Sequence, residues 1–169
     1  MKLMSATAIV SVEDYLRRTE KPYCEYVDGV LFPKALANTA HARVHAGTQV
    51  LLDAQGVQAL GYVHCRLSST KYLIPDLIVD RTFQHPYPTE PVFLCAEILS
   101  PEERIGAMLA KCEQYHAWGV PFCWVIDPEK QTAWQYASGS EPEHLTRTGT
   151  LTAGNLAVSL EELFSAALK

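Results

Sequence analysis

Two carboxylates stand inside runs of otherwise apolar residues, and they constrain the fold more than any other feature of this chain. Glu97 interrupts the apolar run over residues 92–99, and Asp76 interrupts the run over residues 73–79. Runs of this length are typical of strands that are covered on both faces. Because an unpaired carboxylate is costly to bury, each acid needs a cation or water beside it.

A divalent cation bound between Asp76 and Glu97 is the simplest shared explanation, since hard cations take carboxylate oxygens as ligands. Two alternatives stay open. Each acid could lie at a strand end with its head group in water, or each could pair with a nearby arginine or lysine. Pro75 cannot donate to a sheet hydrogen bond, so we expect the strand to be bent there or to lie at an edge.

The rest of the pattern predicts alternating strands and helices, and therefore an α/β (α+β) domain. Asp28-Gly29 predicts the turn of an N-terminal β-hairpin. Strands are expected over residues 23–27, 30–33, 62–67, 72–79, 92–99, 122–126, 132–136 and 144–148. Helices are expected over residues 11–18, 38–54, 101–118 and from 159 to the end, the third of them capped by Ser100 with Pro101 at its first position. The strands on either side of that third helix should form a parallel, right-handed crossover.

Length and composition favour one globular domain over residues 1–169. The chain has 169 residues, 48% of them hydrophobic and 20% charged. It has no apolar run long enough for a membrane span and no signal-peptide pattern, so we expect a cytoplasmic protein. The net charge of −5 counts against broad, non-specific binding to nucleic acid, although a local basic rim can coexist with an acidic total.

Lys111 is a third candidate for the same site. It lies on the flank of the apolar stripe of the helix expected over residues 101–118. From there its stem can lie on the core while its amine reaches the sheet. A lysine in solvent is the simpler interpretation of this position taken alone.

At these residues the chain resembles the Uma2 family of the PD-(D/E)xK nuclease superfamily. The matching segments are residues 11–15, 23–29, 72–76, 96–101 and 111–128. They span most of the chain, and their order and spacing together are specific. The resemblance implies a restriction-endonuclease-like fold, in which a mixed central sheet is flanked by helices.

The resemblance also implies roles for individual residues. Asp76 corresponds to the aspartate of the Pro-Asp motif and Glu97 to the acid of the next strand, and both would bind Mg²⁺ or Mn²⁺ with the backbone carbonyl of Ile98. The superfamily's lysine normally stands two residues after that acid, where this chain has Leu99, so Lys111 on the following helix takes its place. Glu25 matches a recurrent acid near the site that could hold a second metal ion.

Three further side chains lie on the helix expected over residues 38–54. His41 matches a recurrent histidine of the family, and with Arg43 and His45 it would form a polar patch facing a phosphate. His41 and His45 are also spaced as two zinc ligands on one helix face, although no glutamate stands between them as in H-E-x-x-H. Ordinary surface residues remain the simplest interpretation of all three.

Two functions follow from the resemblance. One is a metal-dependent endonuclease that hydrolyses phosphodiester bonds, in DNA, and works as a homodimer because one small domain presents one site and cuts one strand. The other is a degenerate nuclease fold that binds nucleic acid or protein without cleavage. Ala107, where relatives often carry an aspartate four residues before the lysine, favours the second function, as does the acidic balance. The retained Asp76, Glu97 and Lys111 favour the first.

Overall fold

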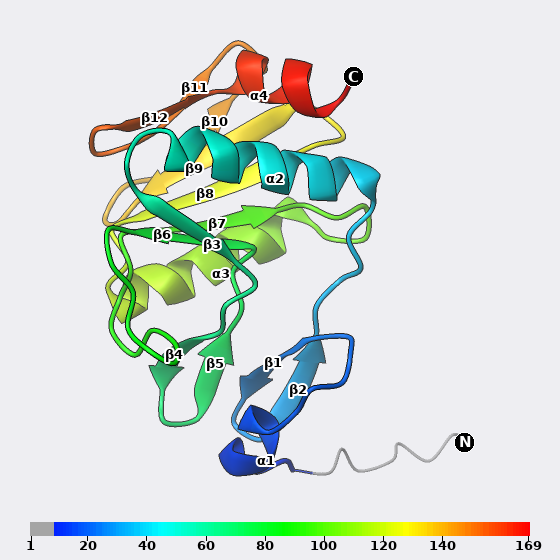
Figure 1. Ribbon diagram of the computed structural model, residues 1–169, viewed down its shortest axis with the longest axis vertical. Coiled ribbons are helices and arrows are strands. Elements are labelled where there is room, and N and C mark those ends of the chain that lie inside the picture. Colours follow the sequence, from blue (N-terminus) through cyan, green and yellow to red (C-terminus); the bar gives the residue numbers. More distant parts are fainter. Residues whose placement is uncertain (1–8) are drawn as a thin grey trace.

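The computed structural model describes residues 9–169, and it places helices on both faces of a six-stranded sheet (Figure 1). In spatial order the strands of this large sheet are β10 (Glu143–Leu145), β9 (Thr132–Ala137), β8 (Phe122–Asp127), β7 (Leu94–Ile98), β6 (Leu77–Asp80) and β3 (Gln58–Gly61). Strands β7 and β8 run parallel, whereas their neighbours pair antiparallel. The sheet is therefore mixed, as expected.

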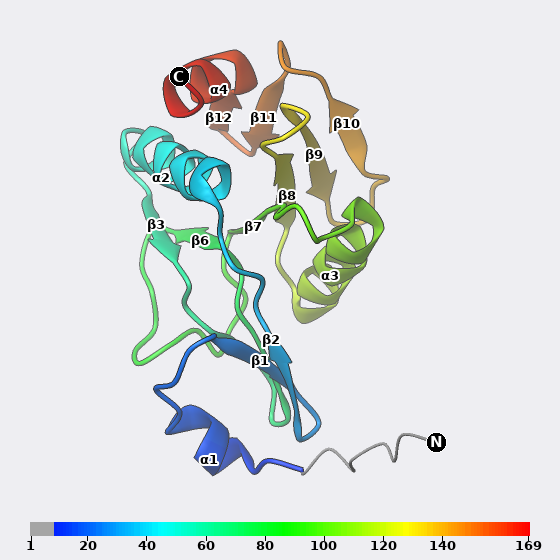
Figure 2. The ribbon, with the colours of Figure 1, turned by 90° about the vertical axis from the view of Figure 1, so that its right-hand side faces the viewer.

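Helices cover the two faces of the large sheet unequally (Figure 2). Helix α3 (Ile105–Trp118) connects β7 to β8 and packs on one face, and the two strands are parallel, as predicted. Helices α2 (Thr39–Asp53) and α4 (Leu160–Ala167) lie on the other face, together with the hairpin of β11 (Thr150–Ala153) and β12 (Leu156–Ser159). Among the described residues, no helix is both long enough and apolar enough to cross a membrane.

A smaller, four-stranded sheet lies at one end of the molecule (Figure 1). Its spatial order is β2 (Val30–Pro33), β1 (Cys24–Val27), β5 (Lys71–Leu73) and β4 (Cys65–Ser68). The hairpin of β1 and β2 turns at Asp28 and Gly29, which both have positive φ, as the Asp-Gly pair predicted. Helix α1 (Val12–Leu16) contributes Tyr15 to an aromatic cluster with Tyr26 and Tyr72.

Strand alternation decides which way Glu97 points. On β7, Leu94, Ala96 and Ile98 belong to the hydrophobic cluster beneath α2 and α4. Cys95 belongs to the cluster beneath α3. Because successive side chains of a strand point to opposite faces, Glu97 shares the α3 face with Cys95. That face also receives the buried side of α3, where Lys111 lies.

The start of α3 differs from the prediction. The helix begins at Ile105 rather than at Pro101, and Arg104 precedes it without a side-chain cap. Residues 100–103 form a turn instead, in which the Glu103 N–H donates to the Ser100 carbonyl at 2.9 Å. The Glu103 carboxylate accepts from the Ser100 N–H at 2.9 Å. Proline at the second position suits such a turn as well as it suits the first turn of a helix, so this signal misplaced the helix start.

One predicted strand is broken in two, another begins later than predicted, and three strands were not predicted. The strand expected over residues 72–79 is broken between β5 and β6, at the position that Pro75 indicated. The strand expected over residues 62–67 begins only at Cys65, and Tyr62 before it has a φ of 58°. Strands β3, β11 and β12 were missed. Gly154-Asn155, which joins β11 to β12, was a usable hairpin signal.

Candidate active site

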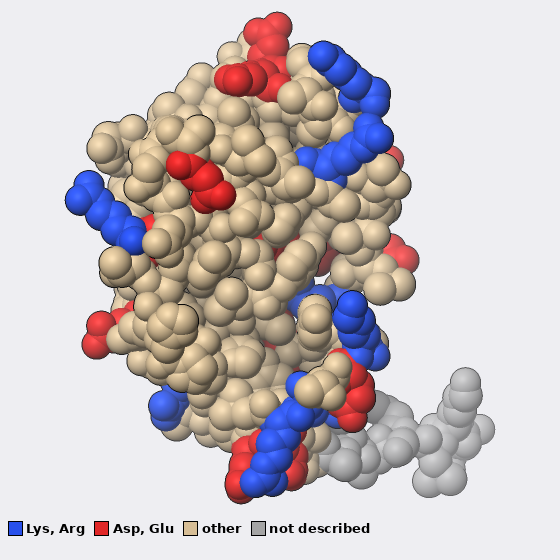
Figure 3. All heavy atoms as spheres, viewed as in Figure 1, with Lys and Arg blue, Asp and Glu red and all other residues tan. Residues whose placement is uncertain are grey.

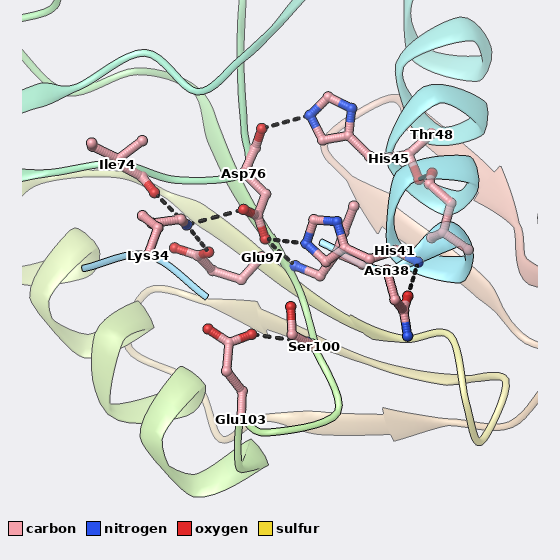
Figure 4. Close-up of polar contacts among 12 residues, drawn as sticks. Lys34, Asn38, His41, His45, Thr48, Ile74, Asp76, Glu97, Ser100 and Glu103 are labelled. Carbon is pink, nitrogen blue, oxygen red and sulfur yellow. Dashed lines mark hydrogen bonds and ion pairs between the residues drawn. The ribbon is translucent and has the colours of Figure 1, made fainter. Parts of the chain in front are cut away.

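Asp76 is buried just before β6 and binds partners with both of its carboxylate oxygens (Figure 4). Oδ2 accepts from the backbone N–H of Ile98 at 2.8 Å and lies 3.3 Å from Nε2 of His41. Oδ1 lies 3.0 Å from Nζ of Lys34. Burial alone would raise the pKa of this carboxyl, but the His41 hydrogen bond, the Lys34 charge and the Ile98 N–H together hold it well below its usual range. Asp76 is therefore a carboxylate at neutral pH.

Glu97 divides its two oxygens in the same way. Oε1 accepts from the Tyr115 hydroxyl at 2.6 Å and from Nζ of Lys111 at 2.9 Å. Oε2 lies 3.4 Å from Nζ of Lys34. Burial, and then the charge of Glu97, raises the pKa of Tyr115 well above its ordinary value, so the phenol stays protonated and remains a donor. One oxygen of Glu97 is thus anchored on α3, and the other faces Asp76 across the Lys34 amine.

Lys111 is buried on α3 rather than exposed to solvent, so the simpler sequence interpretation was wrong. Its Nζ lies 2.6 Å from Oε1 of Glu25 and 2.9 Å from Oε1 of Glu97. Burial alone would lower the pKa of Lys111, but the charges of Glu97 and Glu25 raise it, so the amine is charged. Ala107 is exposed on the same helix. Lys111 therefore draws its carboxylate partners from β1 and β7.

Glu25 joins the small sheet to this group. Its Oε1 accepts from the backbone N–H of Ile74 at 2.8 Å and from Lys111. Both contacts use the same oxygen, and they fix the break between β5 and β6 relative to α3. The structure thus places Glu25 beside the lysine and the chain that carries Asp76.

Lys34 was not singled out in the sequence. It follows β2, and its amine lies 2.7 Å from the carbonyl of Ile74 as well as beside Asp76 and Glu97 (Figure 4). Burial alone would lower the pKa of Lys34, but the charges of Glu97 and Asp76 raise it well above its ordinary value. The alternative that each acid pairs with a nearby lysine is therefore realised in this structure. We call Glu25, Lys34, Asp76, Glu97 and Lys111 the charged cluster.

The three polar residues of α2, His41, Arg43 and His45, do not all contact the same part of the molecule. His41 is buried against Asp76, and His45 reaches the backbone carbonyl of Asp76 at 2.9 Å while its ring stacks on Tyr62. Burial lowers the pKa of His45, which keeps its ring neutral at pH 7. Arg43 is not brought to the charged cluster, because it donates to the backbone carbonyl of Lys169 at 2.8 Å. The polar patch expected from His41, Arg43 and His45 therefore does not form, because Arg43 lies apart from the two histidines.

The donor set of the charged cluster fits a hard divalent cation. Within residues 9–169, no three histidine, cysteine or acidic side chains converge as a metal cage. This argues against a zinc site at His41 and His45. A metal site among these residues would also need ligands other than side chains. Mg²⁺, however, is commonly held by one or two carboxylates with water and substrate oxygens completing its shell. Oδ1 of Asp76 and Oε2 of Glu97 already converge on one cation, the Lys34 amine.

A cleft of about 430 Å³ opens where β7 and β8 end, and its lining residues do not include those of the charged cluster. Its walls carry charges of both signs, including Glu103, Arg104, Glu129 and Lys130. Leu99 and Asn38 also line it, close in sequence to Ile98 and His41. On the face shown in Figure 3, lysine and arginine form separate patches rather than a continuous basic stripe. Binding along that face therefore could not rely on a broad positive surface.

Comparisons with known proteins agree with this fold. The family model described as "Uma2: Putative restriction endonuclease" matches residues 12–168. The crystal structure of "a putative nuclease belonging to DUF820" from Anabaena variabilis superposes with a TM-score of 0.79 at 19% sequence identity, and the match covers 94% of this chain and 99% of that chain. At this identity the likeness shows the fold alone, and it confirms the nuclease-like fold that was expected. No curated protein matches the chain.

Proposed function

This chain belongs to the Uma2 family, whose model is described as "Putative restriction endonuclease", and from that premise we propose that it is a metal-dependent endonuclease that hydrolyses phosphodiester bonds in DNA. One observation carries the proposal. Asp76 and Glu97 each have one oxygen anchored by donors of the protein, and their other oxygens converge on a single cation. Two carboxylate oxygens that converge on one point are ligands that a hard divalent cation takes.

In this proposal Asp76 and Glu97, with the backbone carbonyl of Ile98, would hold Mg²⁺ or Mn²⁺. The carbonyl of Ile74, which lies 2.7 Å from the Lys34 amine, is a further oxygen at the same place. When bound there, such an ion would supply polarisation of the scissile phosphate and a lower pKa for a bound water molecule. Lys111 supplies a fixed positive charge for the phosphate oxygens as negative charge develops on them. Glu25 positions Lys111, and His41 orients the Asp76 carboxylate. Arg43 has no role in this arrangement.

The substrate strand would enter the cleft beside β7 and β8, guided by Arg104 and Lys130 on its rim. Because one such site cuts one strand, we propose that two copies act together on duplex DNA. Cleavage of both strands at the same place would require this homodimer, whereas nicking would not.

Supercoiled plasmid tests the proposal directly. We expect nicking with Mg²⁺ or Mn²⁺ and none with EDTA. Asp76→Asn and Lys111→Met should each reduce the rate by about 100-fold or more, because they remove a metal ligand and a charge-stabilising group. Glu102→Gln, an exposed change in the turn before α3, is the matched control and should keep the wild-type rate. Metal-independent nicking, or nicking that survives in folded Asp76→Asn, would refute the proposal.

A second function is favoured by one observation, the Lys34 amine between the two acids. Because this amine already pairs with both acids, the chain could be a degenerate nuclease fold that binds nucleic acid or protein without cutting it. In that case no metal would produce nicking, and binding of a DNA duplex measured by fluorescence anisotropy would be unchanged by EDTA.

A further inference from the structure

Lys34 is held the way a protein holds a bound cation. Its ammonium group has three N–H donors, and it meets three oxygens: the Ile74 carbonyl at 2.7 Å, Oδ1 of Asp76 at 3.0 Å and Oε2 of Glu97 at 3.4 Å. Its side chain is only 12% exposed. A backbone carbonyl and two carboxylate oxygens are also the ligands that a hard divalent cation prefers.

The oxygens that Lys34 contacts are the ones left over by the other donors. The Ile98 N–H and His41 engage only Oδ2 of Asp76. Lys111 and Tyr115 engage only Oε1 of Glu97. The place where the two acids converge is therefore reserved for one cation, and Lys34 fills it in this structure.

We propose that Lys34 is a tethered cation that competes with the divalent metal for Asp76 and Glu97, and so sets the metal concentration at which the site loads. This inference rests on the proposed function, because it assumes that the two acids bind a metal. It assigns Lys34 the role of a gate on metal loading rather than a catalytic role.

Charge balance supports the exchange. The charged cluster contains three carboxylates and two ammonium groups, so it carries one net negative charge. Exchanging the Lys34 ammonium for a divalent ion would make the cluster neutral. Buried charges are most stable when they are fully compensated, so the exchange is electrostatically favourable at sufficient metal concentration.

The position of Lys34 in the chain allows its amine to leave without unfolding an element. Residues 34–38 link β2 to α2 and belong to no helix or strand. The backbone N–H of Lys34 is fixed to the carbonyl of Tyr23 at 2.8 Å, so the rotatable stem can swing outward from an anchored backbone. Lys111 differs from Lys34, because its amine contacts Oε1 of Glu25 and Oε1 of Glu97, not the Oε2 atom that Lys34 contacts. A metal in the place of the Lys34 amine would therefore not displace Lys111.

Mn²⁺ binding to the intact protein, measured by isothermal calorimetry and by electron paramagnetic resonance of the free ion, tests this without any activity assay. We expect Lys34→Met to bind Mn²⁺ about tenfold more tightly than wild type, or more, because the metal no longer displaces a buried ion pair. Lys21→Met removes an equal charge from the exposed bend before β1 and should change the affinity by less than about threefold, since exposed charges are screened. Asp76→Asn should abolish binding in either background.

The outcomes separate this inference from the proposed function. If wild type binds Mn²⁺ through Asp76 but Lys34→Met binds no more tightly, the metal site stands and the competition is refuted. If neither protein binds, both proposals fall. Tight binding by Lys34→Met beside weak binding by wild type supports both.

A measurement on wild type covers the case in which Lys34→Met does not fold. A buried, ion-paired ammonium exchanges its protons slowly enough for ¹⁵N-edited NMR, and Lys111→Met distinguishes the two buried lysines. Saturating Mg²⁺ should abolish the Lys34 signal and leave the Lys111 signal in place. A Lys34 signal that persists at saturation would overturn the inference.

Discussion

The large and small sheets of this protein are stabilised by different means. The large sheet lies between two extensive hydrophobic clusters, one under α2 and α4 and one under α3. The small sheet has a core of its own made of three tyrosines, Tyr15, Tyr26 and Tyr72, and it shares Cys65 and Leu73 with the cluster under α3. Apolar burial can therefore hold the large sheet unaided, whereas the small sheet needs contacts to its neighbour.

The charged cluster supplies contacts of that kind. Glu25 lies in β1 of the small sheet, and Lys34 directly follows β2 of the same sheet. Glu97 lies in β7 of the large sheet, and Lys111 lies in α3, which packs on that sheet. The ion pairs that shape the candidate active site thus also fasten one sheet to the other. Substitutions in this cluster should therefore affect stability as well as the proposed catalysis.

The largest expected loss of stability comes from a substitution in the core of the large sheet. Trp124 on β8 is fully buried, so Trp124→Ala should lower the free energy of unfolding by about 3–5 kcal/mol, through lost burial and the cavity left behind. Urea denaturation followed by circular dichroism measures this. Leu36→Ala, at a side chain that is 84% exposed, is the control and should change stability by about 0.5 kcal/mol or less. Equal losses in the two variants would contradict the role assigned to apolar burial.

The next effect concerns the junction between the sheets. A double-mutant cycle with Glu25→Gln and Lys111→Met should give a coupling of about 1–3 kcal/mol, since both side chains are largely buried and in direct contact. The exposed pair of Glu13 and Arg17 on α1 provides the comparison, with an expected coupling of about 0.3–0.5 kcal/mol. Urea midpoints of the single and double variants give both values. A coupling at the junction no larger than the one on α1 would mean that the ion pairs do not fasten the sheets.

The smallest effect is confined to the small sheet. The Tyr26 hydroxyl donates to the Val10 carbonyl at 2.9 Å, so Tyr26→Phe should cost about 1 kcal/mol. Hydrogen exchange should show faster opening of β1 and unchanged exchange in β7 and β8, because the weaker sheet opens by itself. Tyr23→Phe, at an exposed ring, should leave both unchanged. Equal acceleration in the two sheets would show that they unfold as one unit.

Much of the fold could be predicted from local patterns. Nearly continuous apolar runs located β7 and β8, and Asp28-Gly29 located the first hairpin, because side-chain burial and turn geometry are local properties. Asn38 and Ser159 cap α2 and α4 through their side chains, close to the predicted starts. Prediction failed where one motif suits two conformations, as at Ser100-Pro101, and where a strand is short and half exposed, as at β3.

The charged cluster was predictable only in part. Asp76 and Glu97 stood out because a carboxylate in an apolar run violates the local rule. Lys34 carried no such signal, since a lysine after a hairpin strand is ordinary at the surface. Arg43 seemed equivalent to His41 in sequence, yet the two residues lie on different sides of α2.

The sequence by itself determined which strands are buried, where the chain turns and that two acids require compensation, because these follow from the preferences of neighbouring residues. Only the tertiary structure decided what compensates them. Lys34 and Glu97 are separated by 63 positions in the chain, and the small sheet must dock on the large one before they meet. Local sequence does not encode which distant charge fills a buried position, because that depends on how whole elements pack.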